Sequence, residues 1–443
     1  MAAHRPRVRP RDLGGRCAGP ACPRLGRRHR CAHRRGRARA RRDRTAHRPG
    51  RRPPVGRPRR GPDRRARRAA RADGVGGTRG RGRARARPGR ARPGRPMRTA
   101  TTVEASGGDW RETVEFVVEA ERLGLDDCWV AEAWGSDAPS ALGYLAARTE
   151  RIRLGSGVIQ VGTRSPVAVA QAALTLHDMS QGRFLLGLGA SGPQVIEGLH
   201  GVPFARPLTR LRETIEVVRA ACAGERIDYD GETVAIPLPG GEGRPMRLST
   251  TPVPDLPVFV AALSPRMLEL TGRVADGWLG TSFVPEGAEA YLAHLDTGLR
   301  AAGRARSAIE VCQGAEVAFA ADEAEQAAMV DARRPGIAFS LGGMGTAERN
   351  FYYDAYRRQG WGERADAVRA AWQRGDRAGA AALVTDEMVL GTTLVGTHER
   401  VGARLRDWAA AGVDTVRLYP AGETLDERLG TLARAVELAR AAG

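Results

Sequence analysis

A glycine-rich stretch, Gly187-Leu188-Gly189-Ala190-Ser191-Gly192, is the first place in this sequence where residue types and spacing suggest chemistry. It fits the pattern G-x-G-x-x-G, in which glycine amides can approach and bind a phosphate or a cofactor closely. The apolar run 184–188 just before it predicts a strand, and a helix is expected after it. The stretch therefore predicts a ligand-contacting turn at the end of a strand.

The basic residues exclude several kinds of chemistry. All 71 of them are Arg, because the chain contains no Lys. A Walker-type phosphate loop, a Schiff-base enzyme and a lysine nucleophile all require the missing amine. Any anionic cofactor group must therefore be held by Arg, hydroxyls, backbone amides or helix ends.

The net charge of +21 is unevenly distributed along the chain. Residues 1–96 hold 35 Arg and four Asp, whereas residues 97–443 carry a net charge of −10. The first segment consists almost entirely of Arg, Ala, Gly and Pro, so it lacks the large apolar side chains that offset the conformational entropy of folding. We expect residues 1–96 to be disordered.

Three interpretations of residues 1–96 remain open. An Arg/Gly-rich tail can neutralise the phosphates of RNA or DNA, although this one has no aromatic residue on which a base could stack. A targeting peptide is a second interpretation, but the apolar region and the Ser residues of such peptides are missing. The favoured interpretation is a start codon assigned too far upstream in GC-rich DNA, with Met97 as the true start.

The six cysteines give no clear metal or disulfide signal. Cys17, Cys22 and Cys31 lie near His29 and His33, but their spacing matches no common zinc finger, so a chance cluster is favoured over a zinc site. The other three, Cys128, Cys222 and Cys312, are widely spaced and are expected to be buried thiols. No run approaches the ~20 apolar residues that span a bilayer, so we expect a soluble, cytoplasmic protein without a membrane partner.

The glycine stretch is one of several strand ends in residues 97–443. Strands are predicted at 98–103, 128–131, 152–159, 184–188, 258–262, 277–280, 310–319 and 415–419, with amphipathic helices such as 110–123 and 206–222 between them. Eight strand–helix units predict an α/β fold, a TIM (β/α)8 barrel, with insertions at about 224–257 and 331–386. A Rossmann domain is disfavoured because three such units precede the glycines and no strand ending in an acid follows them.

Five stretches, taken together and in order, resemble the bacterial-luciferase-like oxidoreductases, and within them the branch that uses the deazaflavin coenzyme F-420. They are Glu132-Ala133-Trp134-Gly135-Ser136-Asp137-Ala138, Arg151-Ile152-Arg153-Leu154-Gly155-Ser156-Gly157-Val158, Leu174-Thr175-Leu176 through Ser180-Gln181-Gly182-Arg183-Phe184, Leu186-Gly187-Leu188-Gly189-Ala190-Ser191-Gly192-Pro193-Gln194 and Val274-Ala275-Asp276-Gly277-Trp278. The resemblance covers essentially all of residues 97–443 and agrees with the predicted barrel.

The resemblance implies a flavin-like ring over the carboxyl ends of the strands. In this family the third strand ends in a bulge, often with a non-proline cis peptide, that supports the ring; here this feature maps to Gly157 and Val158. Gln160 could hydrogen-bond a ring carbonyl. Further cofactor contacts map to two strand ends, at Gly189, Ala190, Ser191 and Gly192 and at Ala262, Leu263 and Ser264. The family usually has glycines at the second of these strand ends, so Leu263 and Ser264 depart from it, and Ser264 is expected to cap the following helix.

The end of the second strand is the most informative departure from the family. Well-known members place Asp-His there, whereas this chain has Glu132-Ala133. Glu132 is therefore the best candidate for a carboxylate near the substrate, as a proton donor or hydrogen-bond acceptor, unless it is a solvated loop acid. Glu197 and His200 could serve instead.

The resemblance implies an oxidoreductase that transfers a hydride between coenzyme F-420 and a small-molecule substrate. An FMN-dependent monooxygenase of the same fold is the alternative enzyme. A nucleic-acid-binding protein with an Arg-rich tail is the alternative of another class, and it is disfavoured because the folded part is acidic. A homodimer is implied by the resemblance alone.

Overall fold

The computed structural model describes residues 97–104, 109–346 and 350–442. The Arg-rich segment 1–96 lies outside the described residues, and so do the predictions of disorder, nucleic-acid binding and a chance Cys/His cluster that concern it. Among the described residues, no helix is both long and apolar enough to cross a membrane.

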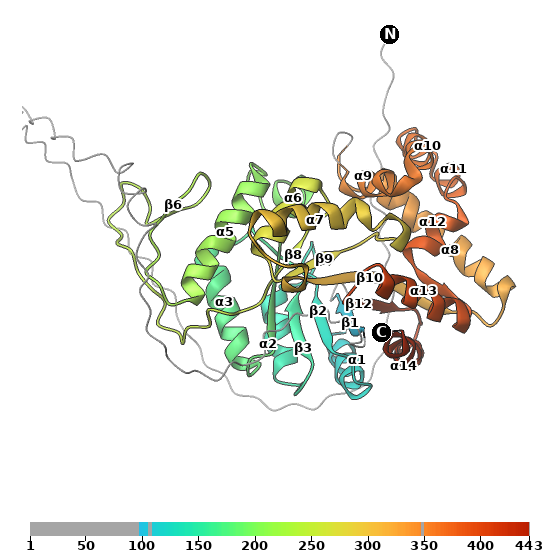
Figure 1. Cartoon of the computed structure of the whole chain (residues 1–443), viewed down its shortest axis with the longest axis horizontal. Helices are drawn as coiled ribbons and strands as arrows, with labels where there is room; N and C mark the ends of the chain where they lie inside the picture. The colour runs from blue at the N-terminus through green and yellow to red at the C-terminus, as the bar shows by residue number, and fades with distance from the viewer. Residues whose placement is uncertain (1–96, 105–108, 347–349, 443) are drawn as a thin grey trace, which may run out of the picture. The chain divides into compact units, whose positions relative to one another are not determined.

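Eight parallel strands form a closed barrel, which confirms the predicted α/β TIM-barrel fold (Figure 1). In order around the barrel they are β1 (Arg98–Val103), β2 (Asp127–Val130), β3 (Arg153–Ser156), β5 (Phe184–Gly189), β8 (Val258–Ala261), β9 (Gly277–Gly280), β10 (Glu310–Phe319) and β12 (Thr415–Pro420). Pairing between β12 and β1 and between β9 and β10 completes the ring. β4 (Ile159–Gln160) pairs with β5, and β11 (Leu394–Gly396) pairs with β10.

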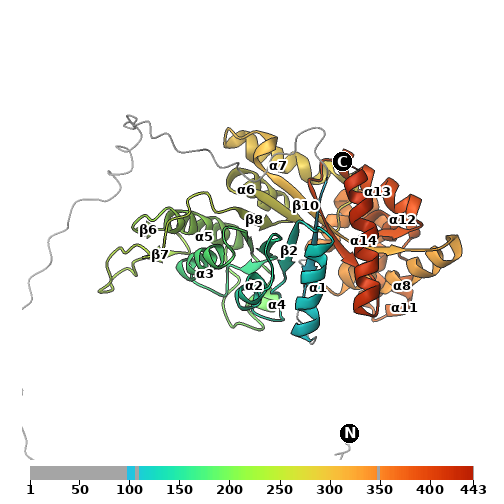
Figure 2. The same cartoon turned by 90° about the horizontal axis from the view of Figure 1, so that it is seen from below.

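Helices surround the barrel and follow its strands. They are α1 (Trp110–Arg122), α2 (Ala138–Ala146), α3 (Pro166–Met179), α4 (Pro193–Ile196), α5 (Pro207–Cys222), α6 (Pro265–Val274), α7 (Glu289–Ala301), α13 (His398–Ala410) and α14 (Leu425–Ala441). Their starts follow the sequence. The side chains of Asp109, Asp137 and Ser165 cap α1, α2 and α3, and Thr424 forms a capping box with Glu427 at α14. The first and last of these helices, α1 and α14, pack against each other (Figure 2).

Two segments interrupt the strand–helix alternation. The first contains the short hairpin of β6 (Tyr229–Asp230) and β7 (Ala235–Ile236), which the Glu213 carboxylate anchors by accepting the backbone N–H groups of residues 232, 233 and 234. The second is helical: α8 (Glu323–Gly342), α9 (Phe351–Tyr356), a π-helical segment (Arg357–Trp361), α10 (Gly362–Gln373), α11 (Arg377–Ala382) and α12 (Asp386–Thr392). These helices gather at one side of the barrel (Figure 1) and pack around an apolar cluster of their own.

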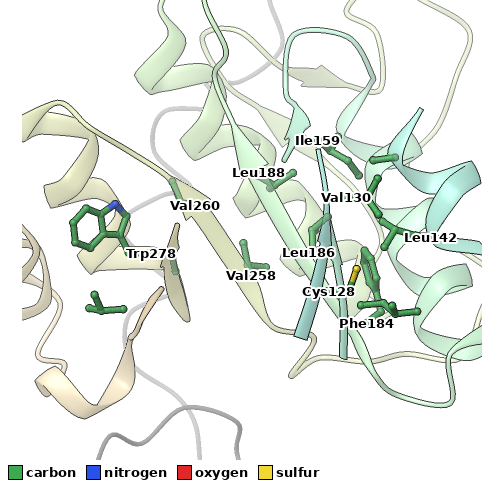
Figure 3. Packing of buried hydrophobic residues seen from close by; sticks show 14 of the residues in the cluster. Cys128, Val130, Leu142, Ile159, Phe184, Leu186, Leu188, Val258, Val260 and Trp278 are labelled. Atoms are coloured by element: carbon green, nitrogen blue, oxygen red, sulfur yellow. The ribbon is translucent and has the colours of Figure 1, made fainter. Parts of the chain in front are cut away.

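The main apolar core lies between the barrel and its surrounding helices. Outward-facing side chains of the strands, among them Cys128, Leu186, Val260 and Trp278, pack there against helix residues such as Leu142 (Figure 3). All three cysteines of the described part, Cys128, Cys222 and Cys312, are buried free thiols, as the sequence predicted.

Candidate active site

Inward-facing side chains fill the interior of the barrel. They are Ala100, Trp129, Leu185, Phe259, Leu279 and Cys312. The rings of Trp129 and Phe259 meet edge to face with their centroids 5.0 Å apart. Val158 and Ala261, from the carboxyl ends of their strands, lie on this cluster and are only partly buried. Side chains therefore fill the barrel and leave no open channel. A ligand site must lie at the carboxyl ends of the strands, which we call the mouth.

The third strand is interrupted where the resemblance placed a bulge. The predicted continuous strand 152–159 is divided into β3 and β4, and the peptide between Gly157 and Val158 is cis. The Gly157 N–H donates to the Val130 oxygen at 2.7 Å. The Ser156 hydroxyl donates to the Gly187 oxygen and accepts from the Gly187 N–H, both at 2.9 Å. These contacts join the interrupted strand to β2 on one side and β5 on the other.

The glycines of β5 are required by this close packing. A Cβ added at Gly187 would lie 1.8 Å from the Ser156 oxygen, and one at Gly189 would lie 2.6 Å from Cγ2 of Val158. Ser191 follows with φ of +61°, in the left-handed region, and the chain then enters α4. The G-x-G-x-x-G stretch thus serves strand packing and a tight turn. We call Gly157, Val158, Gly187 and Gly189 the glycine wall of the mouth.

Gln160 lies beside the glycine wall, and the oxygen of its side-chain amide has no hydrogen-bond partner among the described residues. Its side chain is 3% exposed, and Nε2 donates to the Ala133 oxygen at 2.5 Å. Among the described residues, no donor reaches its buried Oε1. A buried oxygen without a partner is costly unless a ligand supplies a donor. The unused atom is an acceptor, so it suits a ring N–H better than the ring carbonyl that the sequence suggested.

Glu132 lies at the end of β2 and is held by an arginine. The Arg164 guanidinium donates to its carboxylate in a bidentate arrangement, from Nη1 to Oε2 at 2.9 Å and from Nη2 to Oε1 at 2.5 Å, and also pairs with Asp137. The hydrogen bond to Glu132, opposed by burial, raises the pKa of Arg164 above its ordinary value. Glu132 is therefore no isolated loop acid, and its two oxygens already accept hydrogen bonds. The sequence did not single out Arg164.

Glu197 and His200 lie apart from this network, at the end of α4. Both are exposed. Oε1 of Glu197 accepts the Phe204 N–H at 2.9 Å and so fastens the loop that follows. No hydrogen bond joins either side chain to Glu132 or Gln160 among the residues described here. Their catalytic roles stay predictions.

The end of β8 is joined to the helical segment 350–361. Ala262 is buried, and its oxygen accepts the Trp278 Nε1–H at 2.9 Å. The Leu263 oxygen accepts from Nη2 of Arg358 at 2.8 Å. Ser264 is the N-cap residue of α6, as predicted, but its hydroxyl makes no cap hydrogen bond. The Ser264 hydroxyl therefore remains available to a ligand.

The same helical segment also contacts the end of β9. Nε2 of Gln359 donates to the Ser282 oxygen at 2.7 Å, and Oε1 of Gln359 accepts the Val284 N–H at 2.9 Å. Ser282 has φ of +53°, a left-handed turn directly after the strand. With the contact at Leu263, these bonds fix residues 350–361 over two strand ends of the mouth.

Polar side chains face the glycine wall from the opposite side of the ring. Arg417 and Tyr419 stand two residues apart on β12 and point into the barrel, because Arg417 has the inward-facing Ala100 and Gly314 as register partners and alternation puts Tyr419 on the same face. In the ring of eight strands, β12 stands opposite β5 and β10 stands opposite β3. The sequence analysis missed these residues. Their signal was an Arg and a Tyr at alternate positions of an otherwise apolar strand.

A cavity of about 350 Å³ lies elsewhere, between α5 and α6. It is lined by Leu208, Thr209, Arg212, Arg266, Glu269, Leu270 and Arg273. These residues belong to the outer helices, and none of the predicted site residues lines this cavity. The mouth has the convergent strand ends and unused polar atoms that a ligand site needs, so we place the candidate active site there.

A closed parallel barrel with a two-sided mouth at its carboxyl ends defines a TIM-barrel enzyme. The model of the luciferase-like monooxygenase family matches residues 93–415, and the chain belongs to this family. The resemblance inferred from the sequence is thereby confirmed.

Named relatives and a solved structure support the same assignment. A Mycobacterium tuberculosis protein named as a coenzyme F-420-dependent oxidoreductase is 39% identical over 70% of this chain and 90% of its own length. The 5,10-methylenetetrahydromethanopterin reductase of Archaeoglobus fulgidus is 30% identical over 68% of this chain and 87% of its own. The fold also matches the coenzyme F-420-dependent tetrahydromethanopterin reductase of Methanopyrus kandleri, with a TM-score of 0.65 and 22% identity, over 77% of this chain and 99% of that one.

Proposed function

We propose that this enzyme transfers a hydride between coenzyme F-420 and a small organic substrate. The observation that carries the proposal is the partnerless, buried Oε1 of Gln160 beside the glycine wall. The deazaflavin ring, like a flavin ring, carries an N–H donor on its pyrimidine portion, which matches this acceptor. Relatives named for F-420 dependence support the choice of cofactor.

The residues at the mouth fit a flat ring with an anionic side chain. Val158 and Ala261 offer an apolar surface on the interior cluster, and the absence of side chains at Gly157 and Gly189 lets Trp129 and Val158 pack closely against these strands. Gln160 would accept the ring N–H. Ala190, Ser191, Gly192, Leu263 and Ser264 would contact the side chain through backbone amides and hydroxyls. When bound, the cofactor supplies the hydride chemistry.

The chain's own residues would orient the substrate and exclude water. Glu132, held at both oxygens by Arg164, maintains the shape of the site at the end of β2 and does not act as the proton donor. Residues 350–361 cover two strand ends and limit access of water to the mouth. Glu197 or His200 would then deliver the proton.

An FMN-dependent monooxygenase is the second candidate, favoured by the description of the family itself. The apolar floor and glycine wall would accept either ring. A flavin activates oxygen, whereas a deazaflavin carries two electrons as a hydride, so cofactor identity decides the reaction class.

A cofactor titration of the full-length protein tests the proposal. We expect saturable binding of F-420, followed by changes in its absorbance and fluorescence, and much weaker binding of FMN. Tight binding of FMN without binding of F-420 would overturn the first candidate in favour of the second.

A variant of Gln160 tests the residue that carries the proposal. Gln160→Leu removes the acceptor without changing the side-chain volume much, and we expect a loss of ~5- to 10-fold in F-420 affinity, the value of about one hydrogen bond. Gln373→Leu, an exposed glutamine at the end of α10, is the matched control and should bind as the wild type does. Equal affinity in both variants would remove Gln160 from the site.

A further inference from the structure

Arg417 is a buried cation inside the barrel. Only 6% of the residue is exposed. On β12 it lies between Thr415, whose hydroxyl donates to Glu310 at 2.5 Å, and Tyr419, and alternation places all three side chains on the inner face. Its register partner on β1 is Ala100, part of the interior cluster. Arg417 therefore belongs to the barrel interior and not to the surrounding helices, and its bond to Gly280, the last residue of β9, directs the guanidinium toward the mouth.

Its hydrogen-bonding capacity is mostly unused. A guanidinium has five N–H donors, but Arg417 donates one hydrogen bond, from Nη2 to the Gly280 oxygen at 2.5 Å, and its buried Nε has no partner. Within the described part of the chain, no carboxylate forms an ion pair with it. An unpaired buried charge is expensive. Function is the usual reason for such a charge to be kept.

Two other arginines that lack a direct carboxylate contact are bonded very differently, whereas Arg358 resembles Arg417 in donating one hydrogen bond and keeping a buried Nε without a partner. Arg183 donates to three carbonyl oxygens and one hydroxyl, and Arg304 donates to three carbonyl oxygens. Both serve as links between backbone segments. Arg153, lower in the barrel, is paired with Asp127 and Glu310. Among the residues described, Arg417 has neither several carbonyl acceptors nor a carboxylate partner.

The Tyr419 phenol lies near Arg417, and the nearby acid is already paired. Gly314 is the register partner of Arg417 on β10, and a Cβ added there would lie 2.2 Å from the Tyr419 hydroxyl. This hydroxyl therefore lies next to Gly314, at the level of Arg417. Burial and the neighbouring Tyr419 raise the pKa of Tyr352, from α9, while Arg417 opposes the shift. Glu316 is bound by Arg333 at 2.5 Å. The group thus offers hydrogen-bond donors and positive charge.

We propose that Arg417, with the hydroxyl of Tyr419, binds a carboxylate or comparable oxyanion of the substrate, so that the enzyme acts on anionic small molecules. The guanidinium matches a carboxylate in shape and charge, and its bond to Gly280 already fixes its orientation. Arg417 faces the glycine wall across the ring of strands. The inference rests on the proposed function, because it takes the glycine wall as the cofactor side and leaves the opposite wall to the substrate.

Calorimetric titration of the full-length protein, without cofactor, with benzoate and benzamide tests the oxyanion site. The two probes have nearly the same shape and differ in charge. We expect saturable benzoate binding at least ~10-fold tighter than benzamide binding, because hydrogen bonds to a charged group are the stronger ones. Arg417→Gln should remove this preference, and Arg417→Lys should retain part of it. Absence of benzoate binding, or the same preference in Arg417→Gln, would overturn the proposal.

Control variants separate the site from a structural role. Arg304→Gln, which alters a half-buried arginine outside the mouth, should leave the benzoate preference unchanged, and Tyr419→Phe should weaken benzoate binding about 3- to 10-fold. If Arg417→Gln fails to fold, the Tyr419→Phe and Arg417→Lys results decide. Benzoate binding that neither of these variants alters would overturn the proposal.

The affinity for F-420 shows whether the bound oxyanion belongs to the substrate or to the cofactor. It also separates a failure of this inference from a failure of the proposed function. Arg417→Gln should bind F-420 as the wild type does; a ~10-fold loss would assign the cation to the cofactor's own anionic side chain and overturn the inference. If wild-type protein binds no F-420 but retains Arg417-dependent benzoate binding, the proposed function fails while the oxyanion site remains.

Discussion

At the scale of single residues, the mouth combines one saturated ion pair with several unsaturated groups. Glu132 and Arg164 satisfy each other, and Asp137 adds a second carboxylate to the same guanidinium. Gln160 and Arg417, by contrast, each keep hydrogen-bonding atoms unused in buried positions. Saturated groups maintain the shape of a site, whereas unsaturated groups are available to a ligand. This division assigns Glu132 to positioning.

A double-mutant cycle on Glu132 and Arg164 tests that assignment. The side chains are 11% and 23% exposed, so their attraction is only partly screened by solvent. We expect Glu132→Gln and Arg164→Met each to destabilise the fold, and the double variant to cost about 1 kcal/mol less than the sum of the two, measured by urea unfolding. Strict additivity would mean that the bidentate pair contributes nothing. A proton-donor role would instead appear as an altered acidic limb of the pH–rate profile in Glu132→Gln alone.

The sequence identified part of this site and missed another part for physical reasons. Gly157 and Gln160 were predicted through the resemblance to the family, whose third strand ends in a bulge, although which atom of Gln160 is unused required the Ala133 contact. Arg164 was missed because its partner lies 32 residues earlier in the chain. Arg417 was missed because it stands out only by lacking a carboxylate partner among the described residues. A sequence does not show which ion pairs fail to form.

At the scale of elements, β5 and the interrupted third strand depend on each other. Ser156 and Gly187 exchange two hydrogen bonds, and the glycine leaves no room for a side chain between the strands. The apolar pattern predicted one continuous strand over 152–159. Such a pattern reflects burial, and most residues of β3 and β4, on the two sides of the interruption, are buried. The short β11 was missed for a related reason. Three residues are too few for periodicity to register.

Gly187→Ala tests this dependence. The added Cβ would lie 1.8 Å from the Ser156 oxygen, a backbone atom that can move only if β3 moves. We expect a loss of about 1–3 kcal/mol in the free energy of unfolding, together with weaker cofactor binding, because overpacking shifts the backbone. Gly362→Ala is the control, since a Cβ there meets nothing within 4 Å and alanine favours the α10 helix. Equal free energies of unfolding in the two variants would show that β3 and β5 can move apart without loss of stability.

At the scale of the whole molecule, buried charges link the strands across the amino-terminal end of the barrel. Asp127 accepts hydrogen bonds from Arg98 of β1 and Arg153 of β3, and Arg153 also reaches Glu310 of β10. Thr415 of β12 donates to the same glutamate. Five of the eight strands therefore share one polar network below the apolar cluster. The sequence predicted the strands and their order, but only ring closure brings β3 and β10 together.

Asp127→Asn tests how much of the barrel's stability depends on this network. The carboxylate is fully buried, and its loss leaves the Arg98 and Arg153 charges without their main partner. We expect the free energy of unfolding to fall by about 3–5 kcal/mol at neutral pH, the usual effect of removing one member of a buried pair. Asp331→Asn, in a pair with Arg334 whose aspartate is 71% exposed, should change it by less than about 1 kcal/mol.

The pH dependence of the same variant gives an independent result. Burial alone would raise the pKa of Asp127, but Arg153 and Arg98 lower it below its ordinary value of 3.8. Because the folded-state pKa is the lower one, the carboxylate stabilises the fold above pH 3.8, and this contribution is lost as the pH falls through the folded-state pKa. The stability difference between wild type and Asp127→Asn, measured by urea unfolding, should therefore be constant near neutral pH and shrink below pH 3.8. A difference independent of pH down to acid unfolding would mean that packing, and not charge, makes Asp127 necessary.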